Sequence, residues 1–179
     1  MRTRVGYAGG RHPDPTYYNL GDHTESFQVD FDPQRVTYAQ LLDVFWQSHN
    51  HCARPGSRQY MSAVFWHDEQ QYALAVRTRE HEATRRGAPI TTQLLPVGTF
   101  YLAEDYHQKY LLRRRGELFR EFDALYPDWR ELTASTAAAK VNGYLGGNGD
   151  AVQLEEEIGG FGLSERGQQT LRGHVRRGR

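Results

Sequence analysis

Residues 25–50, ESFQVDFDPQRVTYAQLLDVFWQSHN, combine the two hydrophobic patterns that decide the fold class. In the first part, Phe27, Val29 and Phe31 alternate with polar residues, and this period of two predicts a half-buried strand closed by an Asp-Pro pair. In the second part Thr37 is the expected N-cap of a helix. Its apolar residues recur at helical spacing: Leu41, Leu42, Phe45 and Trp46.

The rest of the chain continues this mixture of strands and helices. Further strands are predicted within 58–66 and 89–104, and further helices within 68–87, 105–127 and 133–147. Pro96-Val97-Gly98 divides the second strand run, and Gly87 is expected to end the first of these helices. Because the elements alternate over short connections, the patterns favour an α+β or α/β domain with a single sheet.

The last 30 residues differ from the preceding part in composition. They are polar and interrupted by glycine, with amphipathic fragments and little core material. We therefore predict a main domain at residues 1–149 and a peripheral C-terminal extension at 150–179.

The charge and cysteine content narrow the class of protein. Acidic and basic residues number 22 each, so no net field attracts nucleic acid or anionic lipid, and Arg113–Arg115 is expected to be a solvated helix face. No apolar run approaches the ~20 residues of a membrane span, and no targeting pattern opens the chain. A single cysteine, Cys52, excludes an internal disulfide framework and fits a reducing compartment such as the cytosol.

A first group of candidate site residues lies in PTYYNLGDHTE, residues 15–25. It places Tyr17, His23 and Glu25 close together, with Glu25 at the edge of the first alternating strand. A half-buried carboxyl there could donate a proton near neutral pH. The alternative interpretation is a surface glutamate at the start of a strand.

A second group lies in AEDYHQKY, residues 103–110, where a strand passes into a helix. Asp105 opens the helical pattern, and Tyr106 and Tyr110 are expected to share one helix face at i, i+4 spacing. Site residues often occupy such junctions. The alternative is an acidic helix start with tyrosines that only pack.

A third group, HNHCARPGS at residues 49–57, contains His49, His51 and Cys52. Imidazoles and a thiol this close suggest zinc, but no second Cys/His pair follows at the usual distance, so no metal site is expected. Cys52 could instead be a thiol activated by a neighbouring His or by Arg54. The alternative interpretation is that Cys52 is a small residue without a redox role.

Together these segments resemble the A-class peptide methionine sulfoxide reductases. The matching stretches occur in the family's order over residues 3–112: VGYAGG, PTYYNLGDHTE, VDFDPQRVTYAQLLDVFWQSHN, SRQYMSAVFW and FYLAEDYHQKYL. The resemblance implies an α+β two-layer sandwich, with helices packed on a mixed sheet around a ferredoxin-like core. It also implies reduction of methionine-S-sulfoxide in proteins and in the free amino acid, which repairs oxidative damage.

The resemblance also implies roles for the candidate residues. In the family, a thiolate attacks the sulfoxide sulfur while an acid and hydrogen-bond donors act on the oxygen. Glu25 corresponds to the acid, and Tyr17 and Tyr110 correspond to the hydroxyl donors. Asp105 corresponds to a carboxylate that acts through water, and His23 to a supporting residue of the substrate site.

The family's nucleophile lies in a Gly-Cys-Phe-Trp segment that precedes VGYAGG, and these 179 residues contain no such segment. We therefore expect a reductase whose N-terminus is truncated here, without a nucleophile of the family type. Cys52 is not expected to replace it, because nothing directs its loop toward the sulfoxide site. The alternative is a catalytically inactive relative that binds oxidised methionine or a protein partner.

Cofactors, partners and location follow from the same resemblance. We expect no bound cofactor and no metal, with thioredoxin or another thiol as reductant. The expected partners are oxidised proteins or free methionine sulfoxide, and neither nucleic acid nor membrane. A cytoplasmic monomer is expected, or a mitochondrial one if a missing N-terminus carries a transit peptide.

Overall fold

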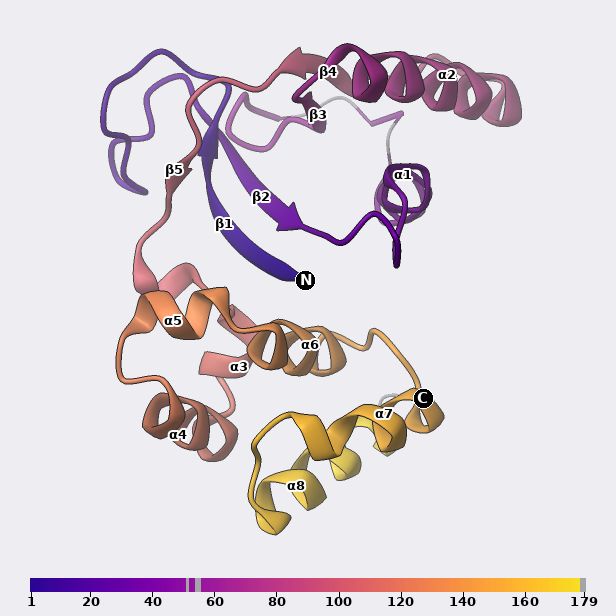
Figure 1. Cartoon of the computed structure of the whole chain (residues 1–179). Coiled ribbons are helices and arrows are strands. Elements are labelled where there is room, and N and C mark those ends of the chain that lie inside the picture. Colours follow the sequence, from indigo (N-terminus) through magenta and orange to yellow (C-terminus); the bar gives the residue numbers. More distant parts are fainter. Residues whose placement is uncertain (51, 54–55, 178–179) are drawn as a thin grey trace. The chain divides into compact units, whose positions relative to one another are not determined.

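The computed structural model describes residues 1–50, 52–53 and 56–177 (Figure 1). They form two compact units. The first, called here the helical unit, comprises Met1–Val5, Gln28–Asp30 and the described residues from Glu104 onward. The second, the mixed unit, comprises Gly6–Phe27 and Phe31–Ala103.

Strands and helices alternate in the first hundred residues, and helices follow. The elements are β1 (Arg2–Ala8), β2 (Thr24–Asp30), α1 (Tyr38–Gln47), β3 (Ala63–Trp66), α2 (Glu69–Arg86), β4 (Gln93–Pro96), β5 (Tyr101–Leu102), the 3-10 turn η1 (Asp105–His107), α3 (Tyr110–Arg113), α4 (Gly116–Leu125), α5 (Trp129–Ala134), α6 (Thr136–Leu145), α7 (Ala151–Glu157), the 3-10 turn η2 (Ile158–Gly160) and α8 (Glu165–Arg177). The predicted α+β class is confirmed.

In the described residues, the strands form two small sheets instead of the single sheet expected. One has the order β2-β1-β5, and β1 pairs antiparallel with β5, placing Gly6 opposite Leu102. In the other, β3 and β4 are parallel, and Trp66 lies opposite Pro96. Pro96 has no N–H to donate and ends β4, so the chain leaves one sheet and joins the other at the predicted Pro-Val-Gly break.

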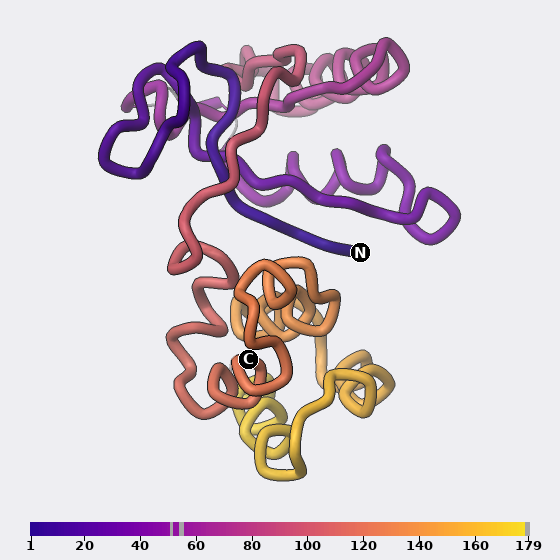
Figure 2. The backbone as a smooth tube through the Cα atoms, turned by 60° about the vertical axis from the view of Figure 1, so that its left-hand side comes forward, coloured from indigo at the N-terminus to yellow at the C-terminus, as the bar shows by residue number. Residues whose placement is uncertain are grey.

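In the mixed unit, α1 and α2 pack with β3 and β4. Their shared core contains Leu42, Trp46, Val64 and Ala75. Figures 1 and 2 both show α2 running alongside β3 and β4. Thr37 caps α1 as predicted, because its hydroxyl accepts a hydrogen bond from the Gln40 N–H and the Gln40 side chain accepts one from the Thr37 N–H.

Strand β2 forms where the alternation predicts it, but the expected burial of Phe27 is wrong. Phe27 is 66% exposed. Among the described residues, neither buried core cluster includes a residue of β2. The alternating pattern shows which residues share one face of the strand, but it does not show which face another element covers. The apolar pattern alone therefore could not predict the exposure of Phe27.

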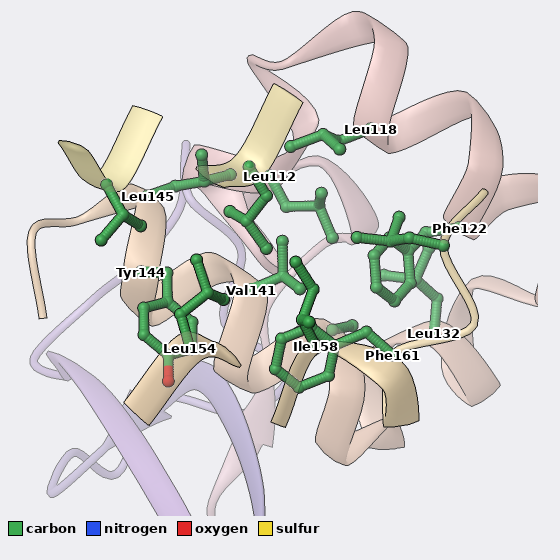
Figure 3. Packing of buried hydrophobic residues seen from close by; sticks show 14 residues of the cluster. Leu112, Leu118, Phe122, Leu132, Val141, Tyr144, Leu145, Leu154, Ile158 and Phe161 are labelled. Atoms are coloured by element: carbon green, nitrogen blue, oxygen red, sulfur yellow. The ribbon is translucent and has the colours of Figure 1, made fainter. Parts of the chain in front are cut away.

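The helical unit has a core of its own, shown in Figure 3. It is lined by Leu112 of α3, Leu118 and Phe122 of α4, Leu132 of α5, Ala138, Val141, Tyr144 and Leu145 of α6, Leu154 of α7, Ile158, Phe161 and Leu163, and Leu171 and Val175 of α8. Six of these residues follow position 150. The expectation of little core material there is therefore wrong, because a few apolar residues on short helices converge on one cluster. The domain boundary at 149–150 stays a prediction.

Candidate functional site

Glu25, the second residue of β2, is an exposed carboxyl held by one neighbour. Its backbone N–H donates to the carbonyl oxygen of Gln59 at 3.0 Å, and its Oε1 accepts a hydrogen bond from Gln59 Nε2 at 2.6 Å. The residue is exposed and not half-buried as the strand pattern suggested. Glu25 therefore presents a fixed carboxyl at a surface that a ligand can reach.

His23 lies two residues earlier and is 1% exposed. Its Nε2 donates to the carbonyl oxygen of His12 at 2.8 Å, and its Nδ1 accepts from the backbone N–H of Gly10 at 3.2 Å. The ring also packs edge-on against Tyr101. Both ring nitrogens thus hold the backbone of residues 10–12 against the start of β2, which is a supporting contact within the mixed unit.

Two further residues fasten the same loop. Asp22 Oδ1 accepts from the backbone N–H groups of Arg11 at 2.8 Å and His12 at 3.0 Å, and these hydrogen bonds lower the pKa of Asp22. The Arg58 guanidinium donates to the carbonyl oxygens of Asp22 at 2.6 Å and Gly9 at 2.8 Å. The loop that carries Tyr17 is therefore tied at both ends to the segment that carries Gln59.

Tyr60 interacts electrostatically with both the Glu25 carboxyl and Tyr17. Tyr17 packs edge-to-face on Tyr18, with ring centroids 5.4 Å apart. The pKa of Tyr60 is raised, first by the negative charge of Glu25 and then by partial burial and by Tyr17. Tyr60 therefore links Glu25 electrostatically to Tyr17, and the three residues belong to the mixed unit. Sequence reasoning missed Tyr60, because it lies within a predicted strand run 35 residues away and no periodic pattern links it to Glu25.

Asp105 and Tyr110 lie in the helical unit, and each contacts an arginine. Arg113 Nη2 lies 3.7 Å from Asp105 Oδ2. Arg114 Nη1 donates to the Tyr110 hydroxyl oxygen at 2.8 Å, and its guanidinium lies 5.6 Å from the centre of the Tyr110 ring. Arg113 and Arg114 were expected only to be solvated, but both contact predicted site residues.

The expected i, i+4 pairing of Tyr106 and Tyr110 on one helix is wrong. η1 ends at His107, and α3 begins at Tyr110 after Lys109, whose φ of 52° is left-handed. Tertiary contacts hold this break in place. Gln108 Oε1 accepts from the Val5 N–H at 3.0 Å, and Gln108 Nε2 donates to the Val5 carbonyl oxygen at 2.9 Å.

The buried Lys109 adds a second anchor to this break. Its ammonium donates to the backbone carbonyl oxygen of Thr3 and, at 2.9 Å, to the Thr3 hydroxyl. Burial, and then the nearby charge of Arg4, lowers the pKa of Lys109 to about 8. Tyr110 is thus placed directly after a residue whose conformation is held by its own buried side chain.

The third candidate group does not form a metal site in the part of the chain that the structure describes. The Cys52 N–H donates to Asn50 Oδ1 at 3.2 Å, and His49 Nδ1 bonds the carbonyl oxygen of Phe45 at 2.8 Å. His51 and Arg54 lie outside the described residues. Within the described residues, no group of three His, Cys, Asp or Glu side chains could hold a metal ion. No helix in those ranges has the length and apolar character needed to cross a membrane.

The fold and these side chains define an α+β protein with an exposed acid–phenol site. A family model described as "Peptide methionine sulfoxide reductase" matches residues 1–125. The peptide methionine sulfoxide reductase of Drosophila melanogaster is 40% identical over 177 residues, which cover 98% of this chain and 71% of that protein. Peptide methionine sulfoxide reductase A5 of Arabidopsis thaliana is 41% identical over 150 residues, which cover 80% of this chain and 58% of the relative.

A solved structure agrees with these sequence matches. Mxr1 of Saccharomyces cerevisiae in its reduced form is similar at a TM-score of 0.60 and 27% identity, over 63% of this chain and 71% of that one. The chain therefore belongs to the peptide methionine sulfoxide reductase family, as its motifs predicted.

Proposed function

We propose that this chain serves the thiol-dependent reduction of methionine-S-sulfoxide to methionine, in oxidised proteins and in the free amino acid. Family membership supports the reaction class. The observation that carries the proposal is the Glu25 carboxyl, which is exposed, held by Gln59 and in electrostatic interaction with Tyr60. A sulfoxide oxygen needs such a proton donor and hydroxyl donors when its bond to sulfur breaks.

Each of the candidate side chains has a role in the proposed reaction. A thiolate attacks the sulfoxide sulfur, the oxygen passes to the attacking sulfur as a sulfenic acid, and the thioether leaves. Glu25 gives the proton that the oxygen requires, and the Tyr17 hydroxyl donates a hydrogen bond to it. A second thiol then converts the sulfenic acid to a disulfide and releases water. In this proposal Tyr110 is a further hydroxyl donor, Asp105 acts through water, and His23 supports the loop.

Cys52 is the single cysteine of the 179 residues, and we do not expect it to be the attacking thiol. Its backbone bonds Asn50 in the segment after α1, whereas Glu25 is held by Gln59. We therefore expect the polypeptide 1–179 to reduce a methionine-S-sulfoxide peptide with dithiothreitol at no more than the background rate. Turnover that disappears in Cys52→Ser would assign the nucleophile to Cys52 instead.

Thioredoxin as the reductant, a monomeric state and a cytoplasmic location belong to the same proposal. A chain that binds oxidised methionine without turnover is the second candidate, favoured because these 179 residues contain no Cys-Phe-Trp segment of the family type. Recovery of activity when a cysteine-bearing segment of the family type is fused before Met1 would support the reductase. Continued inactivity together with intact sulfoxide binding would support the binding protein.

Binding can be tested directly on the chain. The probe is N-acetyl-methionine-(S)-S-oxide methylamide, titrated by calorimetry beside its (R) epimer and its thioether. We expect Glu25→Gln and Tyr17→Phe each to weaken binding of the (S) epimer about tenfold, the loss of roughly one hydrogen bond to a polar ligand. Glu80→Gln in α2 and Tyr18→Phe are the matched controls and should change nothing. Equal affinity for sulfoxide and thioether would refute the proposal.

A further inference from the structure

We propose that Gln59 is the positioning residue of the Glu25 carboxyl, so that the acid of the site is a Gln59–Glu25 pair. The inference rests on the proposed function and deepens it, because it names the residue that sets the direction in which Glu25 presents its proton. Gln59 itself is not expected to touch the substrate.

The contact between the two residues is made at both ends of the glutamate. The backbone N–H of Glu25 donates to the Gln59 carbonyl oxygen at 3.0 Å, and the Gln59 amide donates to Glu25 Oε1 at 2.6 Å. An exposed glutamate otherwise samples several rotamers. One partner that grips both its backbone and its carboxyl restricts the torsions between them.

The short turn that carries Gln59 is itself fixed. The Thr24 hydroxyl donates to the Arg58 carbonyl oxygen at 3.0 Å, and the Met61 N–H donates to the same oxygen at 3.3 Å. The Arg58 guanidinium reaches the carbonyl oxygens of Gly9 and Asp22. Gln59 therefore sits on a turn that is bound to the start of β2 and to the backbone of Gly9, and not on a loose loop.

The chemistry of the amide suits an acid that must carry a proton. Gln59 donates to one carboxyl oxygen and leaves the other, Oε2, to hold the proton that is given to the substrate. An amide donor can bond the carbonyl oxygen of the protonated acid as well as the carboxylate. A lysine or arginine in its place would favour the ionised form, which has no proton to give. The neutral amide thus orients the carboxyl in both protonation states.

A double-mutant cycle separates this role from ordinary stabilisation. In the calorimetric assay, Gln59→Leu should weaken binding of the (S)-sulfoxide probe about fivefold and leave thioether binding unchanged, because only the sulfoxide oxygen needs the oriented acid. In the Glu25→Gln background, Gln59→Leu should weaken binding of the (S)-sulfoxide probe less than about twofold, since the two residues act as a unit. Gln47→Leu, at the exposed end of α1, is the control, and thermal melts show that all variants are folded.

A second measurement does not depend on ligand binding. In nitrogen–proton correlation spectra of the full chain, the Gln59 side-chain amide resonances should shift in Glu25→Ala and stay in place in Glu80→Ala. Unmoved Gln59 resonances, or additive losses in the cycle, would overturn the Gln59 assignment while Glu25 keeps its role. A wild-type chain that does not prefer sulfoxide over thioether would overturn the proposed function and this role with it.

Discussion

Replacing Lys109 by Met tests whether the buried ammonium at the break between η1 and α3 opposes folding. Lys109 is 5% exposed, and its ammonium bonds only oxygens of Thr3 among the contacts described above. Burial and the charge of Arg4 lower its pKa from 10.5 to about 8. The neutral form is therefore favoured in the folded chain relative to the unfolded chain.

The direction of the pH dependence follows from proton counting. Between about pH 8 and the unfolded value of 10.5, the unfolded chain holds the Lys109 proton more often than the folded chain does. The free energy of unfolding therefore rises with pH through this window. Below about pH 8 both states are protonated, and the full cost of the buried charge, roughly 3 kcal/mol for a shift of this size, is present.

The measurement is urea unfolding of the wild-type chain, Lys109→Met and Arg77→Met at several pH values. The stability of the wild type relative to Lys109→Met should rise by about 2 kcal/mol between about pH 7.5 and about pH 9.5. Arg77 is an exposed cation of α2 and serves as the matched control, which should show no such slope. The upper limit stays below about pH 10, because ionisation of unfolded tyrosines opposes the trend above it.

A relative stability that is flat over this window would refute the reasoning. It would mean that Lys109 titrates alike in the folded and the unfolded chain, so that its contacts with Thr3 offset the burial completely. Any overall stability change of Lys109→Met that does not vary with pH reports packing and leaves the test intact.

Two further predictions concern packing. Gly10→Ala places a Cβ 2.6 Å from the ring of His23, so we expect the free energy of unfolding to fall by about 2 kcal/mol and the melting temperature to be lower. Gly98→Ala is the control, because open space surrounds Gly98, and it should change the stability little. Leu171→Ala in α8 removes a fully buried side chain from the helical core and should cost about 3 kcal/mol in urea unfolding. A loss below about 1 kcal/mol would show that α8 adds little to that core.

Local sequence patterns predicted the elements that depend on local contacts. The Thr37 cap of α1 involves Gln40, three residues away, and Gly87 ends α2 in the left-handed conformation that glycine adopts at low cost. Features that depend on distant partners were missed. Gln108 and Lys109 interrupt the helix through contacts with Val5 and Thr3, which lie 103 and 106 residues away in the sequence.

The candidate site shows the same division. The motif segments predicted Tyr17, His23 and Glu25, and the structure places all three in the mixed unit on one loop and strand start. Gln59 and Tyr60 were not predicted, because what joins them to Glu25 is a pair of hydrogen bonds and a charge interaction across 34 and 35 residues. Both residues lie in SRQYMSAVFW, one of the stretches that resemble the family, but that resemblance gave them no role, and the folded chain shows their link to Glu25.

The pairing of Gln108 with Val5 has a consequence for contacts between molecules. A β-strand with open N–H and C=O groups offers a template on which a strand of a second chain can add. At Val5 both groups are already bonded to the amide of one side chain, which imitates the donor and acceptor of a neighbouring strand. Gln108 thus leaves neither backbone group of Val5 open for strand addition at this point of β1, whatever chemistry the site performs.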